Sequence, residues 1–449
     1  MEQLRQDDPD REPVADVPKA EERRAESVPA WGPVQRILFR LLFSYLVLYI
    51  FPFPLNVIPV YGPVLDQSYT EIRRVVAPWV AEHVFGVEVL PRAAGRGDTT
   101  YGHVLIFCSL ILALAATAVW TLLDRKRRND LRDARLHEGL RVYVRFALAT
   151  AIIQYGAVKV IPVQFGTPLS ELLQPIGESS PMGLLWKFMG SSIPYVIFTG
   201  AAEVLGGLLL VARRTTLLGA LVCIGVLSNV VMMNLSYDVP LKLYSSHLLL
   251  MAIFLAAPDL RRLASLFVWN RRVPPAEQRP LFSSRQGNRA ALVFRTVFIL
   301  CFTVVALQES YESKVQLVDV ATQQRLYGVW EVEELAVDGV VRPLLITDET
   351  LWRRLVFEWP GTIGIQYAHE TEVRSYELRP DPGSHVFTLC CEPEWKAAIS
   401  FKQVGPDVLA LEGTVDGKQI RGRFRRMDDS RFPLLSRGFH WTSERLFNR

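Results

Sequence analysis

The fold of this chain is decided by residues 193–235, IPYVIFTGAAEVLGGLLLVARRTTLLGALVCIGVLSNVVMMNL. Two apolar runs, 193–212 and 215–235, lie on either side of the pair Arg213 and Arg214. Each run has about the 20 residues that a helix needs to cross a hydrocarbon core roughly 30 Å thick. The stretch therefore predicts two membrane-spanning helices joined by a short basic turn.

Five further apolar stretches bring the expected total to about seven spans. They are residues 33–53, 101–123, 141–161, 241–258 and 290–308. The whole chain of 449 residues is 50% hydrophobic, and its mean hydropathy is +0.17. These values exclude a purely cytosolic globular enzyme, and they exclude a disordered chain, which would need low hydrophobicity. Arg36 and Arg40 lie early in the first span, where we expect both side chains to snorkel to the interface.

Arginine and lysine are distributed unevenly among the loops. Residues 124–141 and 261–289 are rich in arginine, whereas 162–192 contains a lysine and no arginine. Because basic loops stay on the cytoplasmic side, the pattern predicts a multi-pass protein of the cytoplasmic (inner) membrane with a cytoplasmic N-terminus. Seven crossings then place the C-terminal segment outside the cytoplasm. The small net charge of +4 gives no reason to expect a nucleic-acid partner.

Three segments are expected outside the bilayer core. Residues 1–30 are highly charged and have no apolar period, which predicts a disordered cytoplasmic tail. Residues 69–84 carry apolar side chains at helical spacing and should lie as an amphipathic helix on the outer membrane face. Residues 162–192 mix proline, glycine and short apolar runs, so we expect them to cap the helices or to form a shallow re-entrant loop.

Short alternating runs replace the long apolar stretches after about Ser310. Turn signals separate them, and Asp416-Gly417 is the strongest hairpin signal. The spacing predicts about eight strands in an antiparallel meander that forms a small barrel or a strongly curved sheet. Gly328 and Trp330 resemble the Gly-x-Trp start of lipocalin-like barrels, in which the tryptophan plugs one end. This domain is expected either to bind a ligand in the barrel mouth or to serve as an assembly or lid module with a filled core.

Polar side chains within the predicted spans are the candidate functional residues, because such groups are costly in a bilayer and usually face the interior of a helix bundle. They are Lys159, Glu203, Asn229, Asn234 and His247. If their helices are neighbours, Glu203, Asn229 and His247 share one buried site. Ala202 and Gly206 have the small-xxx-small spacing that lets another helix approach closely.

Two interpretations of this intramembrane site stay open. In the first, Glu203 and His247 relay a proton or bind a polar headgroup such as a quinone carbonyl. In the second, they hydrogen-bond to each other and fix helix packing, with the carboxyl protonated. Lys159 lies near enough to the outer boundary to snorkel. Asp238 and Lys242, four residues apart, are expected to form an ion pair at the outer rim.

Signatures of other cofactors and of metals do not accompany these residues. The sequence has no phosphate-binding loop, no His-Glu-x-x-His and no Cys-x-x-Cys. His103 and His247 lie at different depths of their predicted spans, which argues against a haem held by both. We therefore expect no metal, no evident cofactor other than a quinone, and a protein without catalytic activity of its own.

The middle of the chain resembles DoxX-like membrane proteins. The segments that carry the likeness are 145–165 (RFALATAIIQYGAVKVIPVQF), 180–190 (SPMGLLWKFMG), 198–221, 229–250 and 257–263. The resemblance implies a compact four-helix bundle and association with respiratory or thiol-redox membrane complexes, including subunits of quinone-linked oxidoreductases. It implies no shared cofactor motif. A fainter resemblance, to the membrane domain of vitamin K-dependent carboxylase-like proteins, rests on spans followed by an outer β domain.

The expected fold is thus a polytopic α-helical membrane protein with a DoxX-like four-helix core and a C-terminal antiparallel β-barrel-like domain. Its expected parts are a cytoplasmic tail (1–30), two N-terminal spans with the outer amphipathic segment (31–140), the DoxX-like bundle (141–263), a cytoplasmic loop with the last span (264–309) and an extracytoplasmic, periplasmic β domain (310–449).

Three functions are compatible with these parts. The first is an accessory or ligand-binding subunit of a quinone- or thiol-linked redox complex, with a quinone or a partner subunit bound near Glu203 and His247. The second is a non-enzymatic, membrane-anchored binding or assembly module that acts through its outer β-barrel. The third is a membrane enzyme acting on lipid or peptide with Lys159 or His247 as base, and it is the least supported because no nucleophile or metal set accompanies these residues.

Overall fold

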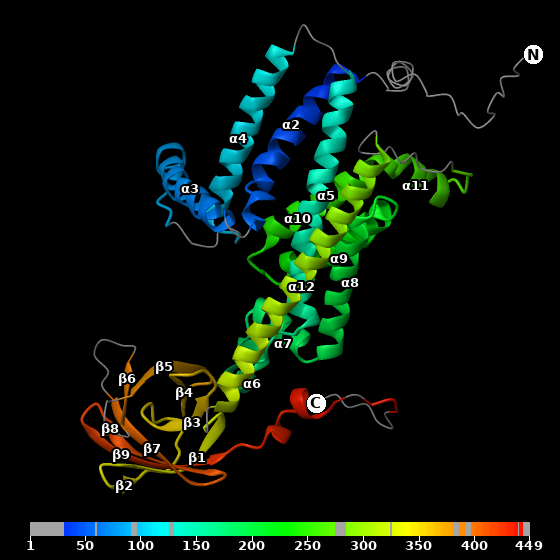
Figure 1. The fold of residues 1–449 in the computed structure, drawn as a ribbon. Helices are drawn as coiled ribbons and strands as arrows, with labels where there is room; N and C mark the ends of the chain where they lie inside the picture. Colours follow the sequence, from blue (N-terminus) through cyan, green and yellow to red (C-terminus); the bar gives the residue numbers. More distant parts are fainter. Residues whose placement is uncertain are drawn as a thin grey trace, which may run out of the picture. The chain divides into compact units, whose positions relative to one another are not determined.

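The computed structural model describes residues 31–58, 61–90, 97–124, 130–273, 284–323, 326–380, 386–390, 397–438 and 440–442. The expected disordered tail, residues 1–30, lies outside the described residues. The chain forms two compact units, and Figure 1 shows their helices and strands. The first unit is built from the chain up to Ala149 together with Leu210–Leu221 and Pro240–Glu277; the second comprises the remainder.

The first unit is helical. Its elements are α2 (Pro33–Ile50), η1 (Leu55–Val57), α3 (Gly62–Phe85), α4 (Thr100–Leu123), the first part of α5 (Asp130–Val160), α10 (Lys242–Ala256), η3 (Ala257–Asp259) and α11 (Leu260–Phe267). Helix α10 begins where the backbone N–H groups of Lys242 and Leu243 donate to the Asp98 carboxylate, at 2.7 and 2.8 Å. The Lys242 ammonium also lies 3.8 Å from Asp98. Asp98 thus satisfies the N-terminal donors of α10, and the Asp238–Lys242 pair stays a prediction.

An ion-pair network joins α2 to the end of α4. The Arg40 guanidinium donates to Asp124 at 2.5 Å and to the Thr121 hydroxyl at 3.1 Å, and Arg132 reaches the same Asp124 carboxylate at 2.6 Å. Arg40 is buried, with 5% of its surface exposed. The prediction that its side chain snorkels to the interface is therefore wrong. The Asp124 carboxylate explains the difference, because a paired guanidinium loses less on burial than an unpaired one.

Helix α3 covers residues 69–84, for which the sequence predicts a helix. Ala77 and Ala81 are buried against Tyr101 and Val104 of α4. Four apolar side chains point away from that contact and are exposed: Ile72, Val75, Val76 and Trp79. The placement of this face on the outer surface of a membrane stays a prediction.

The second unit begins with helices and ends with a β domain. Its helices are the end of α5, α6 (Leu169–Leu173), η2 (Ile176–Glu178), α7 (Pro181–Gly190), α8 (Ile193–Val211) up to Leu209, α9 (Thr216–Ser236) from Val222 onward, and α12 (Arg285–Gln323). Residues 162–192 therefore form short helices, none long enough to cross a bilayer. The Lys187 ammonium is buried there and donates to the Ser179 hydroxyl at 2.7 Å and to the Gln174 amide oxygen at 3.2 Å.

Six helices of the described chain are long and apolar enough to cross a membrane. They are Pro33–Val57, Thr100–Leu123, Ile193–Val211, Thr216–Ser236, Lys242–Phe267 and Arg285–Val318. The predicted span 141–161 lies in α5, which is not among them. Leu148, Ile152, Ile153 and Ala157 of α5 have no exposed surface, so this helix is enclosed by protein and needs less apolar character than a lipid-facing one. The seven-span count and the orientation stay predictions.

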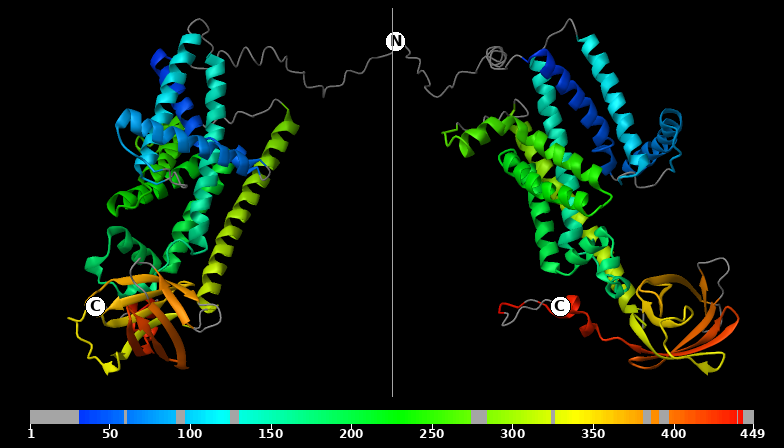
Figure 2. Two further views of the ribbon diagram at one scale, coloured as in Figure 1. Left: turned by 90° about the vertical axis from the view of Figure 1, so that its left-hand side faces the viewer. Right: turned by 180° about the vertical axis from the view of Figure 1, so that it is seen from behind.

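The β domain is a curled antiparallel sheet. Its strands are β1 (Gly328–Val337), β2 (Val340–Val341), β3 (Trp352–Phe357), β4 (Thr362–Tyr367), β5 (Val373–Pro380), β6 (Val386–Cys390), β7 (Ala397–Gly405), β8 (Val408–Val415) and β9 (Lys418–Arg426). They pair in the order β2-β1-β3-β4-β5-β6-β7-β8-β9, and β1 also pairs with β9. Figure 2 shows the sheet curling back on itself in both views. The meander predicted from the alternating runs is confirmed.

Two hairpin turns follow from their Asp-Gly sequences. Asp416 and Gly417 have φ of 50° and 79°, and Val415 pairs with Lys418 across the turn. Asp338 and Gly339 have φ of 51° and 79° between β1 and β2. Positive φ at both central residues is the type I′ geometry that matches the twist of paired strands. The hairpin predicted at Asp416-Gly417 is confirmed.

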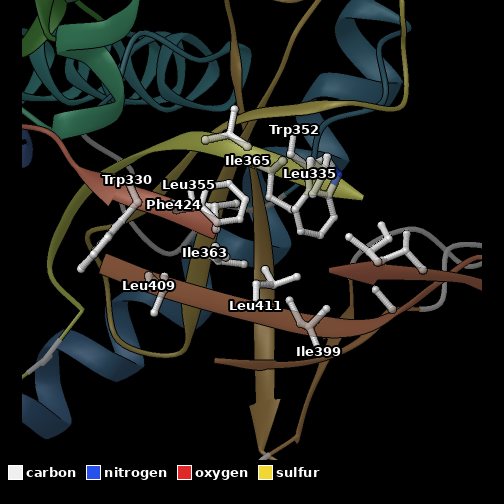
Figure 3. Close-up of a cluster of buried hydrophobic side chains, with 14 of the residues drawn as sticks. Trp330, Leu335, Trp352, Leu355, Ile363, Ile365, Ile399, Leu409, Leu411 and Phe424 are labelled. Atoms are coloured by element: carbon white, nitrogen blue, oxygen red, sulfur yellow. The ribbon is translucent and has the colours of Figure 1, made fainter. Parts of the chain in front are cut away.

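Apolar side chains fill the interior of the curled sheet. Trp330, Trp352 and Phe424 are almost fully buried among aliphatic residues from β3, β4, β7 and β8, and Figure 3 shows these side chains converging. The Trp330 indole N–H donates to the Leu326 carbonyl at 2.8 Å, just before β1. Burial of a tryptophan whose N–H has a partner stabilises the sheet, and a filled interior is one of the two states expected for this domain.

The β domain is held to α6 by a carboxylate and an apolar contact. Glu358 accepts hydrogen bonds from the Leu169 backbone N–H at 2.7 Å and the Ser170 hydroxyl at 3.1 Å. Leu169 packs with Val356 of β3 and with Met427, which follows β9. Burial raises the pKa of the Glu358 carboxyl above its usual range, although the bonds from Leu169 and Ser170 oppose the shift and Glu171 adds to it.

The Glu358 contact predicts a pH dependence of stability. Because the folded-state pKa is raised, the folded protein binds the proton more tightly than the unfolded one. Protonated Glu358 therefore stabilises the folded protein fully below the pKa of the carboxyl in the unfolded chain, about 4.3. This stabilisation is lost as the pH rises through the pKa of Glu358 in the folded protein. Glu358→Gln keeps an acceptor oxygen and removes the titration. In the wild type, we expect hydrogen exchange of the 169–173 backbone amides to speed up with pH by more than the intrinsic pH dependence of amide exchange. In Glu358→Gln, exchange should follow the intrinsic dependence alone.

Glu372→Gln is the matched control, because Glu372 is an exposed carboxylate of the same domain. It should keep the wild-type pH profile. An identical profile for wild type and Glu358→Gln would show that Glu358 does not control the contact.

Candidate functional site

A buried ion pair lies between α5 and α8. The Lys159 ammonium donates to Glu203 Oε1 at 2.5 Å, and the two residues are 5% and 1% exposed. The second carboxylate oxygen, Glu203 Oε2, is buried and has no hydrogen-bond partner. Lys159 also lies over the Tyr155 ring, 5.7 Å from its centroid. The Lys159 side chain is therefore held at Glu203 and is not exposed to solvent. This differs from the prediction that it snorkels to the outer boundary.

Two glycines bring the helices close enough for this pair to form. A Cβ added to Gly200 would lie 2.6 Å from Lys159 Cβ and 2.7 Å from the Gly156 carbonyl oxygen. One added to Gly156 would lie 2.6 Å from the Gly200 carbonyl oxygen. Only hydrogen fits at either position, so the backbones are in direct contact. Each glycine lies three residues before a member of the pair, hence on the same helix face.

A further small residue sets the contact between α8 and α9. A Cβ on Gly206 would lie 2.9 Å from the Cys223 sulfur, so the close approach predicted at Gly206 is confirmed. Cys223 has no exposed surface. The sequence analysis did not predict that Lys159 pairs with Glu203. The signal for the pair is the shared spacing Gly156-x-x-Lys159 and Gly200-x-x-Glu203, which places a glycine and a charged residue on the same face of each helix.

His247 belongs to the first unit and has partners of its own there. Its Nδ1 lies 2.6 Å from the Leu243 carbonyl oxygen, and its Nε2 lies 2.6 Å from the Tyr45 hydroxyl. Nδ1 must carry the proton to donate to a carbonyl, so Nε2 accepts from the tyrosine. The Tyr49 ring stacks on the imidazole at 4.1 Å between centroids and 9° between planes. Three half-buried side chains, Tyr45, Tyr49 and His247, therefore form one cluster.

The structure brings some of the predicted residues together. Lys159 and Glu203 form one site, whereas Glu203 and His247 lie in different units and each has its own partners. Asn234 is buried on α9, and Asn229 is exposed. A site shared by Glu203, His247 and Asn229 stays a prediction.

The β domain has a pocket of about 300 Å³ at one end of the sheet. Its apolar floor includes Trp352 and Ile420, and its rim includes Glu349, His369 and Lys418. Arg374 also lines it, with its guanidinium 5.5 Å from the centroid of the Tyr367 ring and paired with Glu370. Burial, together with the Tyr376 hydroxyl, raises the pKa of the Tyr367 phenol, so this phenol stays neutral. The pocket combines an apolar base with charges of both signs.

Metal ligands do not gather in the described part of the chain: no group of three or more His, Cys, Asp or Glu side chains is placed to hold an ion.

This chain is similar to a bacterial protein over part of its length. The uncharacterized protein YwoB of Bacillus subtilis (strain 168) is 32% identical over 123 residues, which are 27% of this chain and 79% of YwoB. The chain belongs to the same family as YwoB. No family model and no solved structure matches it. Because the match to YwoB covers 123 of 449 residues, most of the chain lies outside the part shared by the YwoB family.

The glycine contact makes the pair sensitive to one methyl group. We expect Gly200→Ala to force α5 and α8 apart, to lengthen the Lys159–Glu203 bond and to lower the free energy of unfolding by about 1–3 kcal/mol, the usual cost of overpacking. The change is measured by thermal unfolding of the full chain in detergent.

Gly225→Ala in α9 is the matched control, because its added Cβ would meet nothing within 4 Å. It should be neutral or stabilise by up to about 1 kcal/mol. Equal melting temperatures for the two variants would contradict the close helix contact.

Proposed function

We propose that this protein is a multi-pass inner-membrane protein of the DoxX-like type that serves as an accessory, ligand-binding subunit of a quinone- or thiol-linked redox complex. In this proposal the N-terminus is cytoplasmic, the β domain is extracytoplasmic, and the ligand is a quinone held at Lys159 and Glu203. The observation that carries the proposal is the Lys159–Glu203 pair, buried between α5 and α8 with one carboxylate oxygen left without a partner.

Stability alone does not account for such a pair. Taking two charges out of water costs several kcal/mol per ion, and replacing a buried pair by apolar residues is often neutral or stabilising. Glu203 Oε2 adds to the cost, because an unpartnered buried oxygen loses its hydrogen bonds to water. Charged groups of this kind within membrane helices usually serve a ligand or a proton.

The two side chains supply complementary chemistry to a quinone. The Lys159 ammonium has three N–H donors, one of which the Glu203 bond uses. The others can donate to a quinone carbonyl oxygen. When electrons from a partner subunit reduce the quinone to the quinol, each carbonyl gains one electron and one proton, and Glu203, once protonated, can pass its proton to the carbonyl oxygen. The chain therefore needs no redox centre of its own, which agrees with an accessory role.

A second candidate function rests on the β domain. The pocket lined by Trp352, Arg374 and Lys418 offers a small-molecule site, and Glu358 fixes the domain to α6. These observations favour a non-enzymatic, membrane-anchored binding or assembly module. The two candidates differ in the variant that abolishes function, which is Glu203→Gln for the first and Arg374→Gln for the second.

Glu203→Gln tests the first candidate. The amide keeps the shape of the carboxyl but loses its charge and its capacity to exchange a proton. We expect quinone that co-purifies with the full chain in mild detergent to fall roughly tenfold or more, because Glu203 positions the Lys159 ammonium for the quinone carbonyl and a hydrogen bond from a charged group contributes about 1.5–3 kcal/mol. Quinone is extracted and quantified by mass spectrometry, and quinone-dependent respiration is measured in the same cells.

Glu309→Gln is the control, since Glu309 is an exposed carboxylate on α12. It should leave both readouts unchanged. Normal quinone content and respiration in Glu203→Gln, at normal protein abundance, would refute the quinone site.

A further inference from the structure

Helix α11, with the turn that follows it, exposes an apolar surface next to arginines. Leu260, Leu266 and Phe267 are 56%, 51% and 74% exposed, and Val268 and Trp269 beyond the helix are 73% and 58% exposed. In a helix, Leu260, Leu263 and Phe267 share one face, and Arg261, Arg262 and Ser265 share the opposite face. The helix is therefore amphipathic, yet most of its apolar face has no protein cover.

A tight turn fixes the end of this surface. Asn270 has a φ of 49°, a left-handed conformation that asparagine tolerates better than most residues. The Trp269 N–H donates to the Ala264 carbonyl and the Arg271 N–H to the Ser265 carbonyl, at 3.1 and 2.8 Å. The chain turns back at this point, so Arg271 and Arg272 follow the exposed side chains of Phe267–Trp269 directly.

The charge of this surface has one sign. The surface carries four arginines and one carboxylate, Asp259, which pairs with Arg262 at 2.5 Å. The arginines are Arg261, Arg262, Arg271 and Arg272. Within the described residues, Arg261, Arg271 and Arg272 have no ion-pair partner. Apolar side chains at the level of a headgroup layer, flanked by arginines, are the features by which an amphipathic helix binds an anionic membrane surface.

We propose that residues 260–272, α11 with its turn, form a binding surface for anionic phospholipid headgroups. Leu266, Phe267 and Trp269 enter the boundary between headgroups and acyl chains, while the arginines contact lipid phosphates. The surface follows α10 after the short turn Ala257–Asp259, and α11 forms the end of the stretch Lys242–Phe267, which is long and apolar enough to cross the bilayer. A membrane that holds α10 is therefore within reach of this surface. The inference is independent of the quinone site.

Hydrogen exchange of the full chain tests this assignment. The protein is reconstituted in vesicles of phosphatidylcholine, with and without phosphatidylglycerol, and exchange of the 260–270 amides is followed by mass spectrometry. Wild-type amides should exchange more slowly in the anionic vesicles, and high salt should weaken the protection. The triple variant Arg261→Gln/Arg271→Gln/Arg272→Gln should lose most of that protection, at roughly fivefold per arginine.

Phe267→Ser/Trp269→Ser removes apolar contact and should lower protection in both kinds of vesicle. A matched control, Arg353→Gln/Lys402→Gln/Arg421→Gln, neutralises three exposed cations of the β domain that lie outside its pocket and should behave as the wild type. Unchanged exchange in the other helices shows that each variant is folded. Equal exchange in the two kinds of vesicle, or protection that appears only when an acidic protein is added, would overturn the proposal.

Discussion

The close approach of α5 and α8 is the constraint on which the candidate site depends. Gly156 and Gly200 leave no room for a side chain between the helices, and this places Lys159 and Glu203, each one turn further along, within hydrogen-bonding distance. A wider separation would leave two unpaired charges in an apolar bundle, which is strongly unfavourable. Backbone contact between the helices therefore sets the geometry in which these two charges are buried as a pair.

The β domain is organised by the alternation of side chains along its strands. Alternation along each strand directs one set of side chains inward, and these fill the curled sheet around Trp330, Trp352 and Phe424. The filled interior leaves its pocket at one end, where charged residues meet the apolar floor. Binding within this domain would therefore involve that end of the sheet, and a small ligand with both polar and apolar parts fits it better than a large apolar one.

Much of this fold can be predicted from the sequence because its signals are long or geometrically unambiguous. Six apolar helices, the strands after Ser310 and the Asp416-Gly417 turn follow from length, alternation and turn chemistry. The partners of Lys159, Arg40 and Lys242 could not be predicted, because each pairs with a residue at least 44 positions away. Tertiary contact decides such pairs. The charged residues of α5 lower its hydropathy, so the sequence does not indicate how deeply this helix is buried.

We infer that the Lys159–Glu203 pair is kept for a ligand and not for stability. A double-mutant cycle of Lys159→Gln, Glu203→Gln and the two together, with unfolding and quinone binding measured on the same full-length protein, tests this most directly. We expect each single change to destabilise the protein and the double variant to recover stability, because no unpaired charge is left in it. None of the three variants should bind quinone. Recovery of quinone binding along with stability in the double variant would show that the pair only fixes the packing of α5 and α8.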